Sequence, residues 1–290
     1  YNSVLALMDT PGNTLLGVYR LLVDDDFRKQ IVGNIKDPVV RMFWIEDYAK
    51  YDPRFRKEII APVQNKIGQL ITSAPLRNIV GQAKSSVDLG FVMEQKRILL
   101  ANLSKGKMGE DKSNLLGSVL TTKMYLAALE RQRIPEEQRK DFYLYIDEFQ
   151  NFSTDIFPSI LSEARKYRLN LNIAHQYLYQ LPEAIRHAIF GNVGTLVAFR
   201  VGGYDAQVLE QEMSPVFTAD DLEHLDNHQI YLRLLIDGKK SKAFSALTLP
   251  PLPKNGQEAD RDTVLKISRS RFTTPRDKVQ NKIENWFENK

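Results

Sequence analysis

The chain has 290 residues and a net charge of +4, from 40 lysines and arginines against 36 aspartates and glutamates. Hydrophobic residues make up 43% and charged residues 26%, which is the ordinary balance of a folded globular protein and excludes disordered, collagen-like and coiled-coil classes. The absence of cysteine excludes disulfides, thiolate zinc sites and cysteine nucleophiles, and it fits a reducing compartment. No apolar run approaches the ~20 residues that a membrane-spanning helix needs. The mild positive charge permits a nucleic-acid partner without requiring one.

Residues 1–95 are predicted to form a helical subdomain, because from residue 12 onward the apolar residues recur at helical spacing. Prolines divide this stretch into four or five helices, and they stand at positions 38, 53, 62 and 75. Asp37-Pro38 and Asp52-Pro53 pair a capping residue with a first-turn proline, which is typical of helix starts.

Residues 96–250 are predicted to form an α/β domain, because short apolar runs alternate with helical segments. The expected strands are 97–103, 142–147, 169–175 and 195–201, and the expected helices are 113–133 and 158–167. Such alternation is typical of a mostly parallel sheet with helices on both faces. Two later runs, 230–236 and 242–249, flank Asp237-Gly238 and predict a hairpin at the sheet edge.

Residues 251–290 are predicted to form a basic tail after the PPLP break at 250–253. From residue 254 onward the tail carries nine basic and six acidic residues, a surplus of 9 − 6 = +3. Val279, Ile283 and Trp286 would share one face of an amphipathic helix. The simpler interpretation is a helix docked on its own fold, and the alternative is an arm that binds a partner.

The strongest chemical signal is an apolar run of strand length that ends in Asp147-Glu148. In nucleotide-hydrolysing α/β proteins a carboxylate at this place holds Mg²⁺, and a following glutamate activates the attacking water. The next strand leads into Gln176, and a right-handed parallel crossover would place Gln176 on the same sheet edge as Glu148. There a glutamine can hydrogen-bond a γ-phosphate or the attacking water. The alternatives are an acidic pair that opens a loop and a polar strand-end residue.

Two arginines are further candidates. Arg165 lies at the end of the crossover helix, so it should be near the opposite edge, ~20 Å from Glu148. It either complements the helix dipole or acts as an arginine finger on a neighbouring subunit. Arg200 ends the following strand, where it either senses the nucleotide at the edge that carries Gln176 or forms a structural ion pair.

The segment GKMGEDKS, residues 106–113, nearly matches the phosphate loop G-x-x-x-x-G-K-[ST], but Asp111 stands in place of the last glycine. A carboxylate there would face the negative phosphates. A plain strand-to-helix loop is the favoured interpretation, and the alternatives are a degenerate phosphate loop and a basic loop that contacts DNA through Lys105 and Lys107. Because no other segment matches, we expect the phosphate-binding motif upstream of Tyr1.

Together these residues resemble the FtsK/HerA superfamily of motor ATPases, and most closely the conjugative coupling proteins and type IV secretion DNA-binding ATPases. The resemblance extends over about residues 97–251 and rests on three ordered features, which are the strand ending in Asp147-Glu148, ILSEARKYRLNLNIAHQ (160–176) and GTLVAFRVGGYDAQVLEQE (194–212).

The resemblance implies a RecA-like P-loop NTPase that binds ATP and Mg²⁺ and assembles as a hexameric ring, which translocates DNA through its channel. By match to the family pattern, Asp147 would coordinate Mg²⁺, Glu148 would be the catalytic glutamate, Gln176 the sensor and Arg165 the finger in trans. Since the family's Walker A motif is missing, this chain alone is expected to be inactive, whereas the full-length parent would hydrolyse ATP.

The implied partners are DNA, further copies of the chain, and proteins of conjugation or type IV secretion. The implied location is the cytoplasm. A region upstream of Tyr1 could also associate the protein with the membrane. Two alternatives stay open, a HerA-like DNA-processing helicase or translocase and a non-hydrolysing scaffold with the same fold.

Overall fold

The computed structural model describes residues 1–251, 253 and 261–288. It contains two compact units, the first formed by residues 1–87 with the described part of 258–290, and the second by the described part of 88–257. We call them the helical unit and the α/β unit. Residue 252 of the predicted PPLP break lies outside the described residues. Residues 254–260, at the start of the predicted tail, lie outside them too.

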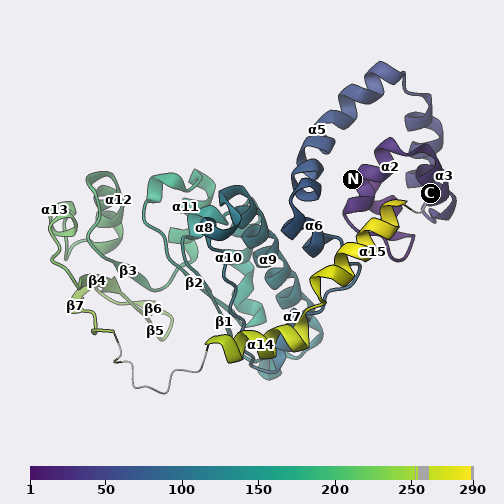
Figure 1. Cartoon of the computed structure of the whole chain (residues 1–290). Coiled ribbons are helices and arrows are strands. Elements are labelled where there is room, and N and C mark those ends of the chain that lie inside the picture. The colour runs from purple at the N-terminus through teal and green to yellow at the C-terminus, as the bar shows by residue number, and fades with distance from the viewer. Residues whose placement is uncertain (252, 254–260, 289–290) are drawn as a thin grey trace. The chain divides into compact units, whose positions relative to one another are not determined.

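The helical unit confirms the predicted helical character. Its helices are α1 (Asn2–Met8), α2 (Leu16–Val23), α3 (Asp25–Asn34), α4 (Pro38–Met42), α5 (Pro53–Thr72), α6 (Ala74–Val80), α14 (Arg261–Phe272) and α15 (Arg276–Glu288) (Figure 1). Asp37 caps α4 by accepting from Val39 N at 2.8 Å, and Asp52 caps α5 by accepting from Arg54 N at 2.8 Å. Both aspartate-proline helix starts are therefore confirmed. Pro62 differs from the prediction, since it lies inside α5, where its ring nitrogen donates no helical hydrogen bond.

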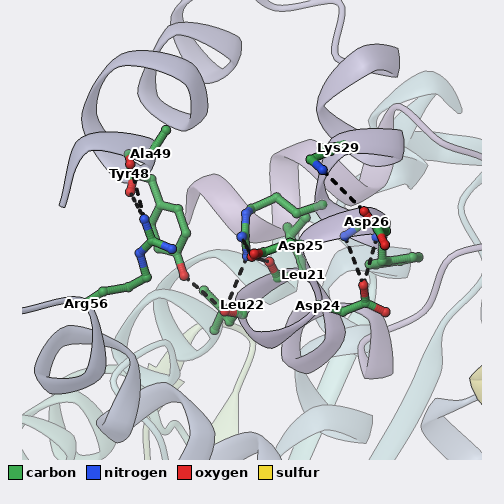
Figure 2. A network of polar contacts seen from close by, with 11 residues as sticks. Leu21, Leu22, Asp24, Asp25, Asp26, Lys29, Tyr48, Ala49 and Arg56 are labelled. Atoms are coloured by element: carbon green, nitrogen blue, oxygen red, sulfur yellow. Dashed lines mark hydrogen bonds and ion pairs between the residues drawn. The ribbon is translucent and has the colours of Figure 1, made fainter. Parts of the chain in front are cut away.

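Polar groups link the helices around the buried ring of Tyr48 (Figure 2). The Tyr48 hydroxyl donates to the Leu22 carbonyl at 3.1 Å, and burial raises the Tyr48 pKa. Arg56 donates to the carbonyls of Tyr48 and Ala49 at 3.2 Å each. Asp24 caps α3 by accepting from Phe27 N at 3.0 Å. These bonds fix the ends of α2 and α3 against the segment that precedes α5.

The C-terminal helix α15 docks on the helical unit, as the simpler interpretation of the tail predicts. Val279 and Ile283 are buried and pack with Leu16 of α2. The Trp286 ring meets the Phe27 ring edge-on, with centroids 5.6 Å apart. The Trp286 carbonyl also accepts from Arg20 Nη1 at 2.7 Å, so apolar and polar contacts both hold the helix.

The α/β unit alternates helices and strands in the order visible in Figure 1. Its elements are α7 (Leu89–Glu94), α8 (Lys105–Met108), α9 (Glu110–Glu130), β1 (Phe142–Ile146), α10 (Phe157–Glu163), β2 (Leu169–Ile173), α11 (Glu183–Asn192), β3 (Leu196–Ala198), α12 (Gly203–Met213), α13 (Ala219–Glu223), β4 (Gln229–Arg233), β5 (Leu235–Ile236), β6 (Lys239–Lys240) and β7 (Phe244–Leu247). No helix in the described part of the chain is long and apolar enough to cross a membrane.

The strand pairing follows the predicted α/β class. Strands β1 and β2 pair in parallel, with Phe142 opposite Leu169 and Ile146 opposite Ile173. Strands β3, β4 and β7 form an antiparallel sheet, and β5 pairs with β6 across Asp237-Gly238. Because Asp237 and Gly238 both have positive φ, of 49° and 77°, the predicted hairpin is confirmed with its expected turn chemistry.

Two details of the sheet differ from the prediction. Residues 97–103 form no strand, and Ile98 and Leu100 remain 88% and 84% exposed, because no described segment pairs with them. Strand β3 pairs antiparallel with β4 rather than extending the β1–β2 pair. An apolar run predicts an extended segment, but the pairing partner depends on the whole fold.

Candidate functional site

A tightly held turn follows β1 and carries Asp147 and Glu148. The Glu148 backbone is left-handed, with φ 49° and ψ 45°, and its N–H donates to Asp147 Oδ1 at 2.9 Å. The next residue, Phe149, is fully buried against Phe157, with ring centroids 4.6 Å apart, and its N–H donates to the Ala174 carbonyl at 2.8 Å. Buried Phe149 thereby anchors the turn to the end of β2.

Two amide side chains hold the Glu148 carboxylate. Gln176 Nε2 donates to Oε1 at 2.6 Å, and Gln150 Nε2 donates to Oε2 at 2.7 Å. The structure therefore brings Glu148 and Gln176 together at the carboxyl ends of the parallel pair. Gln150 was missed in the sequence, because a polar residue in a turn is too common to point to a site. Its position two residues after Glu148 was the available signal.

Asp147 is exposed beside Glu148, with a carboxylate that can ligate a hard cation. No group of three or more His, Cys, Asp or Glu side chains gathers as a metal cluster among the residues the structure describes. A single carboxylate fits Mg²⁺, which keeps several waters and takes its remaining ligands from substrate phosphates. The donor set therefore fits a magnesium ion that arrives with a phosphorylated ligand.

Lys105 on α8 reaches the same turn. Its Nζ donates to Asn151 Oδ1 at 2.8 Å and to Glu110 Oε1 at 2.6 Å, so its charge is paired with a carboxylate. Lys107, on the same helix, is exposed. Helix α9 opens with Glu110 and Asp111 directly after Gly109. These carboxylates would repel a phosphate at the start of α9, which favours a plain loop there over a degenerate phosphate loop.

Arg165 lies at the opposite end of β1. It belongs to the 3₁₀ turn Ala164–Tyr167, and the carbonyl of Arg168, the residue after this turn, accepts from Phe142 N at 2.9 Å. Arg131 and Arg139 donate to the carbonyls of the turn at 2.6 and 2.5 Å. The turn is thus rigidly held while Arg165 itself is exposed, and the structure does not bring Arg165 to Glu148 of the same chain.

Arg200 is exposed beyond the end of β3. Because β3 pairs with β4 and not with β2, Arg200 is not placed on the edge of the parallel pair by strand pairing. Within the described ranges no hydrogen bond or ion pair joins Arg200 to Gln176 or Glu148. Neither the sensor interpretation nor the ion-pair interpretation is visible in its contacts.

The segment after Gln176 is anchored by residues that were not singled out in the sequence. Leu178 is 4% exposed, and its N–H donates at 3.0 Å to Oδ2 of Asp205, which is also buried. His175, on the other side of Gln176, has its pKa lowered by burial. The backbone that follows Gln176 is therefore fixed at Leu178 to the core that contains α12 residues.

Comparison with known proteins supports the resemblance. Residues 141–225 match a family model described as the TraM recognition site of TraD and TraG. A structure of the bacterial conjugative coupling protein TrwBdeltaN70 in an unbound form superposes with a TM-score of 0.58, and the plasmid coupling protein TrwB in complex with ADP and Mg²⁺ superposes with 0.57. No curated protein sequence matches the chain significantly.

Both structural matches have 14% sequence identity and cover 87% of this chain but 61% of the coupling-protein chain. At this identity the likeness shows the fold, which is the RecA-like P-loop type with a helical N-terminal part. The family model covers the segment from the start of β1 to the end of α13, which contains Asp147, Glu148, Arg165, Gln176 and Arg200. The matched segment and the shared fold together make the chain similar to the conjugative coupling proteins.

Proposed function

We propose that the full-length protein is an ATP-driven DNA translocase that serves conjugation or type IV secretion and works as a hexameric ring. The observation that carries this proposal is the 2.6 Å hydrogen bond from Gln176 to Glu148 at the carboxyl ends of β1 and β2. A glutamate and a glutamine that meet at this edge of an α/β sheet are suited to positioning water and to sensing a phosphate.

Glu148 acts as the base of the reaction. When the nucleotide binds, Gln150 stays hydrogen-bonded to Glu148 Oε2, whereas Gln176 donates to a phosphate oxygen in place of Glu148 Oε1. Oε1 can then accept a proton from the attacking water. Asp147 holds Mg²⁺, which neutralises charge on the phosphates when the nucleotide is bound. The TrwB structure with ADP and Mg²⁺ supports these ligands. The phosphate-binding motif is supplied by a part of the full-length protein outside these residues.

Arg165 serves a neighbouring subunit. It is exposed on a rigid turn at the end of β1 opposite to Glu148, so it is out of reach of the site in its own chain. In a ring, the same position faces the next subunit, where a guanidinium can stabilise the charge that develops in phosphoryl transfer. The arrangement requires a closed assembly for activity.

DNA is the proposed substrate, and lysine and arginine side chains bind its phosphates without base specificity. Lys107 is a candidate for such a contact. Lys105 is a candidate too, although its ammonium group is paired with Glu110. The family description supports a protein partner from the conjugation machinery for residues 141–225. We place the motor in the cytoplasm, associated with the membrane through another part of the full-length protein.

The test is DNA-stimulated ATP hydrolysis by the full-length parent, compared with its Glu148→Gln variant. Loss of the base should lower kcat by roughly 10²–10⁴-fold while nucleotide affinity is kept. Glu137→Gln is the matched control, because Glu137 is an exposed glutamate of the same unit. Equal rates for the parent and Glu148→Gln would refute the assignment of the base. Absence of hydrolysis in the parent would favour the non-hydrolysing scaffold.

A further inference from the structure

Three exposed tyrosines lie around the segment that follows Gln176. Tyr177 and Tyr179 are 49% and 66% exposed, and their ring centroids are 6.1 Å apart. Tyr204, at the start of α12, is 54% exposed. Single exposed rings are ordinary on a protein surface, but rings that lie close together can mark an interaction site.

The backbone holds these rings outward. Leu178 lies between Tyr177 and Tyr179, and it is buried in the core formed with α12 residues. The Leu178 N–H is bonded to Asp205, the neighbour of Tyr204, at 3.0 Å. Because Leu178 points inward and is anchored to α12, the tyrosines on both sides are presented to solvent next to Tyr204.

One arginine contacts Tyr204, and a second lies four residues before Tyr204 in the chain. Arg186 of α11 donates to the Tyr204 hydroxyl at 2.7 Å, which links α11 to the start of α12. Arg200 is exposed a few residues before Tyr204, directly after Phe199, which is 54% exposed. Across the described residues, neither arginine forms an ion pair with a carboxylate. Neither positive charge is therefore neutralised by a carboxylate within the described residues, although Arg186 already donates to Tyr204.

We propose that this tyrosine–arginine surface, formed by Tyr177, Tyr179, Arg186, Arg200 and Tyr204, binds single-stranded nucleic acid. Unpaired bases can stack on exposed rings, and phosphates can pair with guanidinium groups. A duplex fits less well because its bases are already stacked inside the helix. The proposal deepens the proposed function, since Tyr177 follows Gln176 directly and links strand contact to the group that holds Glu148.

The experiment is fluorescence anisotropy of a fluorescein-labelled oligothymidylate of about 20 nucleotides, titrated with the full chain without nucleotide. Tyr177→Ala and Tyr179→Ala should each raise Kd by roughly 5- to 100-fold, because stacking is lost. Tyr177→Phe and Tyr179→Phe keep the ring and should stay within about twofold. Arg186→Gln should weaken binding and reduce its salt dependence.

Tyr143→Ala is the matched control, since Tyr143 is a 57% exposed tyrosine on β1 opposite Asn170, near the start of β2, whereas Tyr177 follows the end of β2. Absence of binding by the unmodified chain, an unchanged Kd for both alanine variants, or an equal loss for Tyr143→Ala would overturn the proposal. So would alanine variants that alter the sedimentation of the chain while leaving its Kd unchanged, because the surface would then be a contact between copies.

The same titration separates this inference from the proposed function. Oligonucleotide binding is measured on the tyrosine variants and ATP hydrolysis on Glu148→Gln, so either proposal can fail without the other. If Glu148→Gln leaves ATP hydrolysis unchanged while the tyrosine variants lose the oligonucleotide, the proposed catalytic base fails and the binding surface stands. If Glu148→Gln loses ATP hydrolysis while the tyrosine variants bind the oligonucleotide like the unmodified chain, the binding surface fails and the catalytic base stands.

Discussion

The docking of α15 leads to a quantitative prediction about Ile283. This side chain is 6% exposed and packs with Leu16 and Val279. Its Cδ1 atom lies 2.7 Å from the point that a Cβ on Gly81 would occupy, so it touches the backbone after α6 directly. Replacing Ile283 by alanine should therefore open a cavity between α15, α2 and the end of α6.

The expected cost follows from the atoms removed. Ile283→Ala deletes three carbons, and at ~0.8 kcal/mol each their transfer from the interior to water accounts for ~2.4 kcal/mol. The cavity adds to this because the surrounding helices relax only in part. We expect the free energy of unfolding of the helical unit to fall by about 2–5 kcal/mol.

Tryptophan fluorescence during urea unfolding measures this change selectively. The chain has 2 tryptophans, and both Trp44 and Trp286 belong to the helical unit. Glu284→Ala is the control, since Glu284 is the exposed neighbour of Ile283 on α15, and it should shift the free energy by no more than ~0.5 kcal/mol. An unchanged unfolding midpoint for Ile283→Ala, at an unchanged slope, would refute the argument that α15 stabilises this unit.

Further predictions concern one aspartate and two glycines. The N–H of Phe27, together with Arg20, holds the Asp24 pKa below its ordinary 3.8, so its contribution to stability is present above pH 3.8 and is lost as the pH falls below it. In fluorescence-monitored urea unfolding, Asp24→Asn should therefore lower the midpoint near neutral pH and flatten its decline below about pH 4. Gly117→Ala would place a Cβ 2.1 Å from Phe152 Cδ1, and this overlap should cost about 1–3 kcal/mol in thermal unfolding followed by circular dichroism. Gly191→Ala, with no atom within 4 Å of the new Cβ, should be neutral or add up to ~1 kcal/mol.

The parts of the fold that could be predicted are those set by local rules. The parallel pairing of β1 and β2 follows from the helix between them, because adjacent parallel strands need a crossover connection of this kind. The β5–β6 turn follows from Asp237-Gly238, since both residues tolerate positive φ. Residues 97–103 show the limit of the method, because an apolar run does not specify which strand it pairs with.

The candidate site also has a part that the sequence predicts and a part that it does not. The meeting of Glu148 and Gln176 follows from two parallel strands that end at one edge. The approach of Lys105 to Asn151 depends on how α8 packs, and the role of Gln150 depends on a left-handed turn at Glu148. Neither is encoded in a periodic pattern.

The contacts of Glu148 bear on how hydrolysis could be coupled to strand binding. An ionised carboxylate accepts about four hydrogen bonds, and Gln150 and Gln176 supply two, so Glu148 is oriented while it keeps the capacity to accept a proton from water. Gln176 is the partner that lies nearer to the tyrosine–arginine surface, because Tyr177 follows it directly in the chain. A strand that moved Tyr177 would act on Gln176 through one peptide bond, whereas the buried Phe149 would keep Glu148 in place. Any coupling between the tyrosine–arginine surface and hydrolysis should therefore depend on Gln176 more than on Gln150.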